Sequence, residues 1–414
     1  MRNQNLAQFT ERIIISIVGL TNVGKSTIFN LITGQKNKAI VDAKAGTTAD
    51  NVVSLMEIHG LGKTKIIDTA GIDEEGVLGN KKREKTQEAI AESDLIIFVL
   101  KNDAKILTNY EKNILEYLKS KNKKFIVVYN KFNNEKVNLN IDCQSIEIDA
   151  NNVLEQPKLI NFIKENCNKN LQKVELLPHL KLENSYVLLI IPLDEESPEL
   201  RLLRPQSMII ERLLNVFAIP VLYRPDLKNF NEEHFTKTIN DLKNTENGLS
   251  LIITDSQAID KIYNFVPKDV NFTSFSIIMS NFMSGGKILD FINNTLTIEK
   301  LQDNDKILIV EACNHDRKCD DIATVKLPNA IKKYTNKNLI FEFNFGQSFL
   351  TETELKEKNY KLVIMCGGCM IDKQKYLARL ELLNDLKIPT TNYGIVFSYL
   401  KNKNILTSTT KLFK

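Results

Sequence analysis

A short segment near the start of the chain has the residue types of a phosphate-binding loop. Residues 19–26 fit the pattern GxxxxGKS, and Thr27 follows. The two glycines let backbone N–H groups close around an oxyanion, and a helix N-terminus adds a favourable dipole. The lysine can reach terminal phosphates, and the serine hydroxyl can bind Mg²⁺. We therefore predict phosphate contacts from Gly19, Asn22, Val23, Gly24, Lys25, Ser26 and Thr27.

Two later segments suit the metal and the terminal phosphate of a nucleoside triphosphate. Thr48 lies in the polar stretch 41–50 and can give its hydroxyl to Mg²⁺. Asp68 follows a strand-like run and can hold the same metal directly or through water. Three residues later, the N–H of Gly71 can sense the γ-phosphate and order its loop. We predict Ser26, Thr48 and Asp68 as the magnesium ligands.

A third segment, Asn130-Lys131-Phe132-Asn133, matches the guanine-reading NKxD element in position and type. It differs in its last residue, because asparagine has one acceptor oxygen where aspartate has two. We predict base contacts from Asn130, Lys131 and Asn133, with a weaker preference for guanine.

The cysteines suggest a second site far along the chain. Four of the six lie between residues 313 and 369. Cys313 and Cys366 each follow a strand-like apolar run, and parallel strands end at the same edge of a sheet. Together with Cys369 and His315 they would suit zinc. Thiolates alone would suit an iron–sulfur cluster, and Cys366-x-x-Cys369 could also be a redox dithiol. Spacing leaves these three possibilities open.

The strands and helices that would position these residues predict an α/β protein. Near-continuous apolar runs predict buried parallel strands that helices cover on both faces. Strands are predicted at 13–18, 65–68, 95–100, 125–129, 186–191, 220–223, 273–279, 306–310 and 361–365, a strand and turn at 249–257, and helix-like runs at 204–217 and 231–243. We predict a P-loop nucleotide-binding domain at 1–168, followed by two smaller α/β domains with mainly parallel sheets at 169–265 and 266–414.

Charge and hydropathy exclude some classes of partner. The net charge of +4 is small for 414 residues, so it favours neither nucleic acid nor an acidic membrane. The apolar run near 186–191 is far too short to span a bilayer, and residues 1–9 lack an apolar signal core. We expect a cytoplasmic protein whose cysteines are not structural disulfides.

Residues 12 to about 168 resemble the Era/TrmE-like GTPases. The resemblance implies binding of GTP and GDP with Mg²⁺. Asn22 stands where this branch has an asparagine that helps to hold a monovalent cation, usually K⁺. Ile72 stands where Ras-like proteins have a water-positioning glutamine. Isoleucine cannot orient water, so we expect slow hydrolysis that K⁺ stimulates.

The whole chain resembles the [FeFe]-hydrogenase maturation GTPases, the HydF family. That family carries C-x-H and, about fifty residues later, H-C-x-x-C; here the segments are 313–315 and 366–369, with Met365 in place of the second histidine. Segments 192–206, 253–257 and 320–328 are similar too. The resemblance implies a dimerisation domain and a [4Fe-4S] cluster on Cys313, Cys366 and Cys369. His315 or Glu311 is the implied fourth ligand.

The implied function is that of a scaffold for metal-cluster assembly. The protein would accept a di-iron subcluster precursor made with two radical-SAM maturases and deliver it to apo-[FeFe]-hydrogenase, with GTP as a switch and a homodimer as the assembly. Two alternatives stay open. One is an Era/TrmE-like GTPase of ribosome assembly or tRNA modification, and the other is a zinc-stabilised regulatory GTPase.

Overall fold

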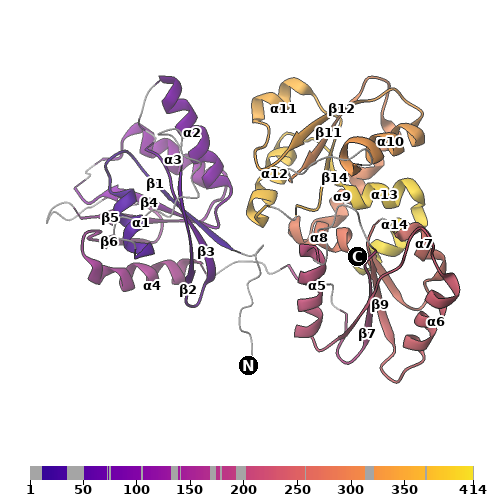
Figure 1. The fold of residues 1–414 in the computed structure, drawn as a ribbon. Helices are drawn as coiled ribbons and strands as arrows, with labels where there is room; N and C mark the ends of the chain where they lie inside the picture. The colour runs from indigo at the N-terminus through magenta and orange to yellow at the C-terminus, as the bar shows by residue number, and fades with distance from the viewer. Residues whose placement is uncertain are drawn as a thin grey trace. The chain divides into compact units, whose positions relative to one another are not determined.

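The structure, a computed structural model, describes most of the 414-residue chain. The described residues are 12–34, 51–71, 73, 76–103, 106–131, 139, 141–167, 174–177, 180–192, 202–256, 258–312, 321–368 and 371–413. The chain divides into two compact units, Met1–Gln172 and Lys173–Lys414. Both consist of helices packed around mainly parallel sheets (Figure 1).

The first unit is built on a six-stranded sheet with the order β2-β3-β1-β4-β5-β6. Among the strands that the structure describes in this unit, only β2 and β3 form an antiparallel pair. The strands are β1 (Ile13–Val18), β2 (Val52–Ile58), β3 (Gly62–Asp68), β4 (Leu95–Lys101), β5 (Phe125–Asn130) and β6 (Ser145–Ile148). The main helices are α1 (Lys25–Thr33), α2 (Gly76–Ala91), α3 (Asn109–Ser120) and α4 (Gln156–Cys167).

Strand β1 is buried along its whole length because helices cover both of its faces. Ile13, Ile15 and Ile17 pack with side chains of α1 and α4. Val18 points to the opposite face and packs with Ile90 of α2. Successive side chains of a strand alternate between faces, so a doubly covered strand needs apolar residues at nearly every position.

The second unit contains two four-stranded sheets in which all neighbouring strands are parallel. The first has the order β10-β9-β7-β8 and consists of β7 (Tyr186–Ile190), β8 (Ile219–Tyr223), β9 (Leu249–Thr254) and β10 (Asn271–Ser274). The second has the order β12-β11-β13-β14 and consists of β11 (Lys306–Glu311), β12 (Ile340–Phe345), β13 (Leu362–Met365) and β14 (Thr390–Asn392). The predicted fold class is confirmed.

The helices of this unit are α5 (Arg204–Asn215), α6 (Glu232–Lys243), α7 (Ile259–Ile262), α8 (Phe275–Met283), α9 (Ile288–Thr295), α10 (Leu327–Thr335), α11 (Glu352–Lys358), α12 (Lys373–Asp385), α13 (Tyr393–Lys401) and α14 (Lys403–Thr410). One expectation was wrong here. Residues 273–279 were predicted as a strand, but β10 ends at Ser274 and α8 begins at the next residue. The Ser274 hydroxyl accepts a hydrogen bond from Ile277 N and caps the helix.

The two sheets of the second unit share one topology. In each, the first strand lies between the second and third, and the fourth lies beside the third. A helix follows the fourth strand in both copies, and the sequences there are alike. Residues 273–278 read Thr-Ser-Phe-Ser-Ile-Ile, and residues 391–396 read Thr-Asn-Tyr-Gly-Ile-Val. The second unit therefore consists of two tandem copies of one parallel α/β arrangement.

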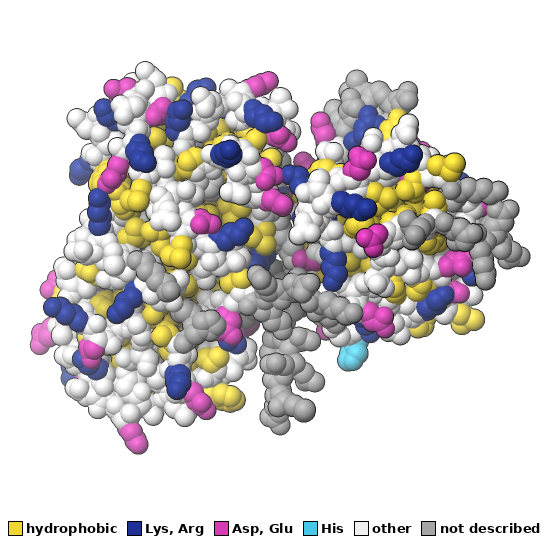
Figure 2. All heavy atoms as spheres, turned by 180° about the vertical axis from the view of Figure 1, so that it is seen from behind, with side chains coloured by type: hydrophobic (Ala, Val, Ile, Leu, Met, Phe, Trp, Pro, Cys, Tyr) yellow, Lys and Arg dark blue, Asp and Glu magenta, His cyan; other side chains and the backbone are white. Residues whose placement is uncertain are grey.

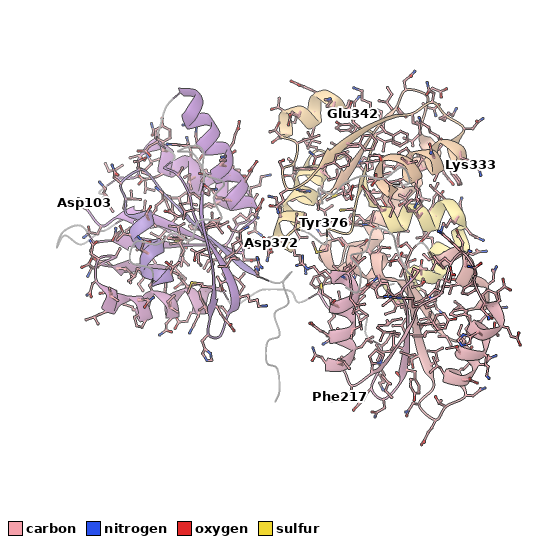
Figure 3. All side chains as sticks on the ribbon, in the orientation of Figure 1. Asp103, Phe217, Lys333, Glu342, Asp372 and Tyr376 are labelled. Atoms are coloured by element: carbon pink, nitrogen blue, oxygen red, sulfur yellow. The ribbon has the colours of Figure 1, made fainter. Side chains whose placement is uncertain are left out.

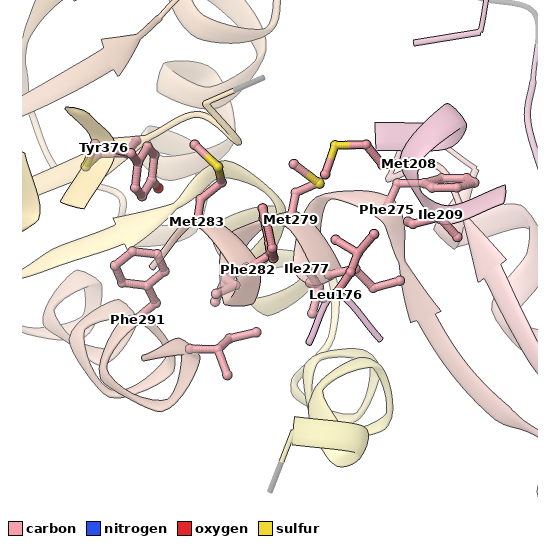
Figure 4. Close-up of a cluster of buried hydrophobic side chains, with 14 of the residues drawn as sticks. Leu176, Met208, Ile209, Phe275, Ile277, Met279, Phe282, Met283, Phe291 and Tyr376 are labelled. Atoms are coloured by element: carbon pink, nitrogen blue, oxygen red, sulfur yellow. The ribbon is translucent and has the colours of Figure 1, made fainter. Parts of the chain in front are cut away.

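One hydrophobic core joins the two copies. It takes side chains from β7 and β9 of the first sheet, from β11 and β13 of the second, and from α5, α8, α12 and α13. Figure 4 shows Met208 of α5, Met279 and Met283 of α8, and Tyr376 of α12 in a row through this core. The predicted division at residue 265 falls between β9 and β10, inside the first sheet.

The helix that ends each copy packs on the last strand of the other copy. Helix α9 follows α8 in the chain, and Asn294 Nδ2 donates to the carbonyl of Thr390 in β14, at 3.0 Å. Helix α14 follows α13, and the hydroxyl of Thr273 in β10 donates to the carbonyl of Thr409, at 2.8 Å. The two copies thus cover each other reciprocally.

The surface carries charges of both signs. On the face in Figure 2, Lys and Arg side chains are interspersed with Asp and Glu. Within the described part of the chain, no helix combines the length and the apolar character that a bilayer crossing requires.

Candidate functional site

The loop between β1 and α1 makes two left-handed backbone turns. Gly24, directly before α1, has a φ of 91°, and Asn22 has a φ of 59°. A Cβ on Gly19 would lie 2.6 Å from the carbonyl oxygen of Val99 in β4, so only glycine fits there. Val23 is buried under the loop. Thr27 lies in the first turn of α1.

The structure brings together three of the side chains predicted for phosphate and magnesium, Lys25, Ser26 and Asp68. Ser26 Oγ donates to one carboxylate oxygen of Asp68, at 2.6 Å. The other oxygen of Asp68 is buried and has no hydrogen-bond partner within the described residues. Burial raises the pKa of this carboxyl, against the Ser26 hydrogen bond and the charge of Lys25. A buried carboxylate with an unused oxygen beside a hydroxyl is a donor set that fits Mg²⁺.

Lys25 is buried at the start of α1, and its Nζ donates to the carbonyl of Leu20, at 2.6 Å. Burial lowers the pKa of Lys25, although the charges of Asp68 and Asp73 oppose this shift. A buried ammonium that bonds to a loop carbonyl has incomplete charge compensation. An anion bound in the loop would supply it.

The loop after β3 closes directly on the phosphate loop. A Cβ on Gly71 would lie 2.1 Å from the hydroxyl of Thr21, so the two backbones touch. Asp73 Oδ1 accepts hydrogen bonds from Thr21 N, at 2.7 Å, and from the Thr21 hydroxyl, at 2.6 Å. Burial alone would raise the pKa of Asp73, but the bonds from Thr21 outweigh it and lower the pKa. The contact between Thr21 and Asp73 was not predicted from the sequence. The sequence indicates it only by an acidic residue directly after Ile72.

Asn130 connects the predicted base-reading segment to the phosphate loop. Its side chain donates to the carbonyl of Val23, at 3.1 Å, and accepts from the N–H of Ala150, at 3.2 Å. The N–H of Lys131 donates to the carbonyl of Ile148, at 2.9 Å. The end of β5 therefore ties the phosphate loop to the loop after β6, on the side where a base would lie.

The second candidate site lies at the end of two adjacent strands, β11 and β13. The N–H of Cys366 continues the ladder by donating to Val310 O, at 2.9 Å. Its sulfur accepts from the N–H of Ala312, at 3.2 Å, and from that of Gly368, at 3.4 Å. Backbone N–H groups that point at a sulfur favour its thiolate form, which is the form that ligates metals.

Two other predicted ligands directly follow the residues whose N–H groups reach this sulfur. Cys313 directly follows Ala312, and Cys369 directly follows Gly368. Glu311 is the buried last residue of β11, and its carbonyl accepts from Gly346 N, at 2.8 Å. Five predicted residues lie outside the described ranges: Thr48, Asn133, Cys313, His315 and Cys369. Among the residues that are described, no three His, Cys, Asp or Glu side chains form a metal-binding group.

Comparisons with known proteins match the first unit to GTPases. Residues 14–131 match the family model of the 50S ribosome-binding GTPases. GTPase Der of Thermosipho melanesiensis is 38% identical over 170 residues, or 38% of this chain and 37% of Der. The tRNA modification GTPase MnmE of Mycoplasmoides gallisepticum is 36% identical over 178 residues, or 40% of this chain and 38% of MnmE. The chain thus matches less than two fifths of each relative.

A solved structure of Era with MgGDPNP and nucleotides 1506–1542 of 16S ribosomal RNA is also similar. It is 20% identical, with 51% of this chain and 91% of that chain covered and a TM-score of 0.31. On the sequence matches and the loop geometry, the first unit is a P-loop GTPase domain.

The second unit matches two further families. Residues 176–284 match the hydrogen maturase F dimerization domain, and residues 289–411 match the hydrogen maturase F tetramerization domain. With the GTPase domain, these matches account for most of the chain. The chain belongs to the hydrogen maturase F family of hydrogenase maturation GTPases. Its dimerisation and tetramerisation domains support an oligomeric protein.

Proposed function

We propose that this protein is a GTP-hydrolysing scaffold that holds a [4Fe-4S] cluster and delivers a di-iron subcluster to apo-[FeFe]-hydrogenase. The observation that carries the proposal is the environment of Cys366. Its sulfur receives two backbone N–H groups at the end of a buried parallel strand. One of those N–H groups belongs to Ala312, the residue before Cys313.

In this proposal, Cys313, Cys366 and Cys369 hold the cluster, with His315 or Glu311 as the fourth ligand. An iron without a thiolate ligand supplies an exchangeable coordination position for an incoming di-iron precursor. The cargo comes from two radical-SAM maturases and passes to apo-hydrogenase. A cytoplasmic location fits, because thiolate ligands persist in a reducing compartment.

Anaerobic reconstitution with iron and sulfide tests the cluster. We expect the dithionite-reduced protein to give the EPR signal of a reduced [4Fe-4S] cluster. Cys366→Ser should lose that signal and most of the bound iron. Cys143→Ser is the matched control, because Cys143 is a half-buried cysteine of the GTPase domain. Stoichiometric zinc with no paramagnetic cluster would contradict the proposal and favour a zinc-stabilised regulatory GTPase.

Transfer needs its own assay. Wild-type protein loaded in the presence of the two maturases should activate purified apo-[FeFe]-hydrogenase, and the Cys366→Ser variant should not. Activation by the maturases alone, without this protein, would contradict the carrier role.

We also propose that K⁺ accelerates GTP hydrolysis. Asn22 holds a left-handed turn in the phosphate loop, where a side-chain oxygen can reach a cation beside the phosphates. The expected result is hydrolysis several-fold faster in KCl than in NaCl at equal ionic strength. Asn22→Ala should reduce this difference, with steady-state phosphate release as the measurement. Equal hydrolysis rates in the two salts would contradict a role for K⁺ in the reaction.

The nucleotide preference follows from Asn133, which offers one acceptor oxygen to guanine. Parallel titrations with GTP, XTP and ATP analogues separate the cases. We expect the GTP analogue to bind most tightly, by a smaller margin than an aspartate would give. Tighter binding of the ATP analogue would contradict the proposed base site.

Asp73 is expected to weaken binding of the nucleoside triphosphate. Its carboxylate already accepts the Thr21 N–H and lies close enough to Lys25 to interact with its charge. A γ-phosphate in the loop would repel this carboxylate. Asp73→Asn should therefore raise the affinity for a non-hydrolysable GTP analogue by about threefold, with little change for GDP. Calorimetric titration of both nucleotides measures this difference.

The control is Asp142→Asn, which removes the same charge elsewhere in the GTPase domain. Equal effects of Asp73→Asn on the triphosphate analogue and on GDP would show that the carboxylate does not distinguish them.

A further inference from the structure

The turn that carries Cys366 packs against side chains of two helices, α8 and α12. Gly368 has a φ of 67°, and a Cβ there would lie 2.7 Å from Cδ2 of Tyr376 and 3.1 Å from Cε of Met283. A Cβ on Gly367 would lie 4.0 Å from the Cβ of Met279, which is an ordinary contact distance. The turn therefore rests directly on an aromatic ring and on a methionine side chain.

Tyr376 also bonds to the residue whose sulfur would bind the metal. Its hydroxyl donates to the carbonyl oxygen of Cys366, at 3.3 Å. The side chain is 1% exposed on α12, and burial raises its pKa. Asn392 makes a second link to this strand end, because its side-chain amide donates to Met365 O, at 3.1 Å. Tyr376 is labelled in Figures 3 and 4.

The methionines come from the other copy of the fold. Met279 and Met283 belong to α8, which follows β10 of the first sheet and falls within the dimerization-domain match. Figure 4 shows Met283 between Tyr376 and Met279. The turn Cys366–Gly368 is thus supported by side chains of two helices, α12 of its own copy and α8 of the preceding copy.

We propose that Tyr376 and Met283 are positioning residues for the cluster. They fix the turn Cys366–Gly368 by a hydrogen bond to its first carbonyl and by packing under its last glycine. Cys366 Sγ is thereby held where the N–H groups of Ala312 and Gly368 reach it. This inference rests on the proposed cluster for its function, but the positioning of the turn can be measured without iron.

The first test compares two tyrosine hydroxyls. Tyr376→Phe removes the bond to Cys366 O and keeps the ring. Tyr360→Phe is the matched control, because Tyr360 is also buried in the second copy but donates to Glu342, away from the turn. In the apo protein, we expect hydrogen exchange of the Cys366–Gly368 amides to become about fivefold faster in Tyr376→Phe only. In the reconstituted protein, iron loss to a chelator should accelerate by a similar factor.

The second test compares two buried methionines. Met283→Ala removes the contact under Gly368, whereas Met208→Ala removes a methionine from the same core at α5. We expect faster exchange of the turn and faster iron loss for Met283→Ala, at matched global stability.

The outcomes separate this inference from the proposed function. If neither Tyr376→Phe nor Met283→Ala changes amide exchange in the turn beyond its control, the positioning role is wrong. If the turn loosens as expected but the wild-type protein takes up no cluster, the positioning stands and the cluster function fails.

Discussion

Replacing Gly368 with alanine is expected to abolish most cluster binding, whereas the same change at Gly367 should leave it intact. A φ of 67° costs an L-residue about 1 kcal/mol. The new methyl group would also overlap the fully buried ring of Tyr376, and overpacking of this kind costs about 1–3 kcal/mol. Together these costs correspond to a loss of about tenfold or more in the population of the binding-competent turn.

Iron and sulfide content after anaerobic reconstitution measures this effect directly. Gly367→Ala is the matched control, because among the described residues its Cβ would meet nothing closer than 4.0 Å. Thermal unfolding of the apo variants shows whether the damage is local. Full cluster content in Gly368→Ala would mean that the turn can shift away from Tyr376, and the steric argument would fail.

Replacing Lys25 with methionine is expected to weaken binding of GTP and GDP by about 100-fold. The ammonium is buried beside the phosphate loop and bonds to Leu20 O. In the nucleotide complex it would contact the terminal phosphates, and hydrogen bonds between charged groups are the strongest that a side chain makes. Fluorescent-nucleotide titration of both diphosphate and triphosphate measures the loss.

The unfolding temperature of nucleotide-free Lys25→Met provides the control. Burial lowers the pKa of Lys25, so the charged form is less favourable in the folded protein than in the unfolded chain. At neutral pH the charge therefore works against folding, and methionine should leave stability unchanged or raise it. A large drop in unfolding temperature would show that Lys25 is a structural residue.

Sequence patterns located the central strands because their burial is nearly complete. Strands β1, β4 and β5 are apolar at almost every position, and this feature is specific to parallel sheets with helices on both faces. Patterns failed where the apolar run was short. Residues 273–279 are apolar enough for either a strand or a helix, and the Ser274 cap decides in favour of the helix.

Four strands, β2, β6, β12 and β14, were not predicted, and the last two illustrate different reasons. Strand β12 lies at the edge of its sheet, and its residues are only partly buried. Strand β14 has three residues, Thr390–Asn392, and no apolar side chain among them. Neither gives the continuous apolar signal that marked the inner strands.

The candidate sites were predictable to the extent that their chemistry is local in sequence. The GKS motif and the cysteine spacing are the basis on which Lys25, Ser26 and Cys366 are predicted. The contacts of Asp73 with Thr21, and of Tyr376 with Cys366, join residues from different elements. Only the folded chain brings them together, so no spacing rule could have named them.

The reciprocal packing of α9 and α14 has a consequence for synthesis of the chain. Strand β10 is complete by residue 274, but the helix that packs beside it spans Lys403–Thr410. A ribosome therefore has to translate as far as about residue 410 before α14 can cover its side of β10. Until then this side of β10 stays uncovered, and nascent chains on one polysome expose it to one another. Chaperone protection should matter most during this interval.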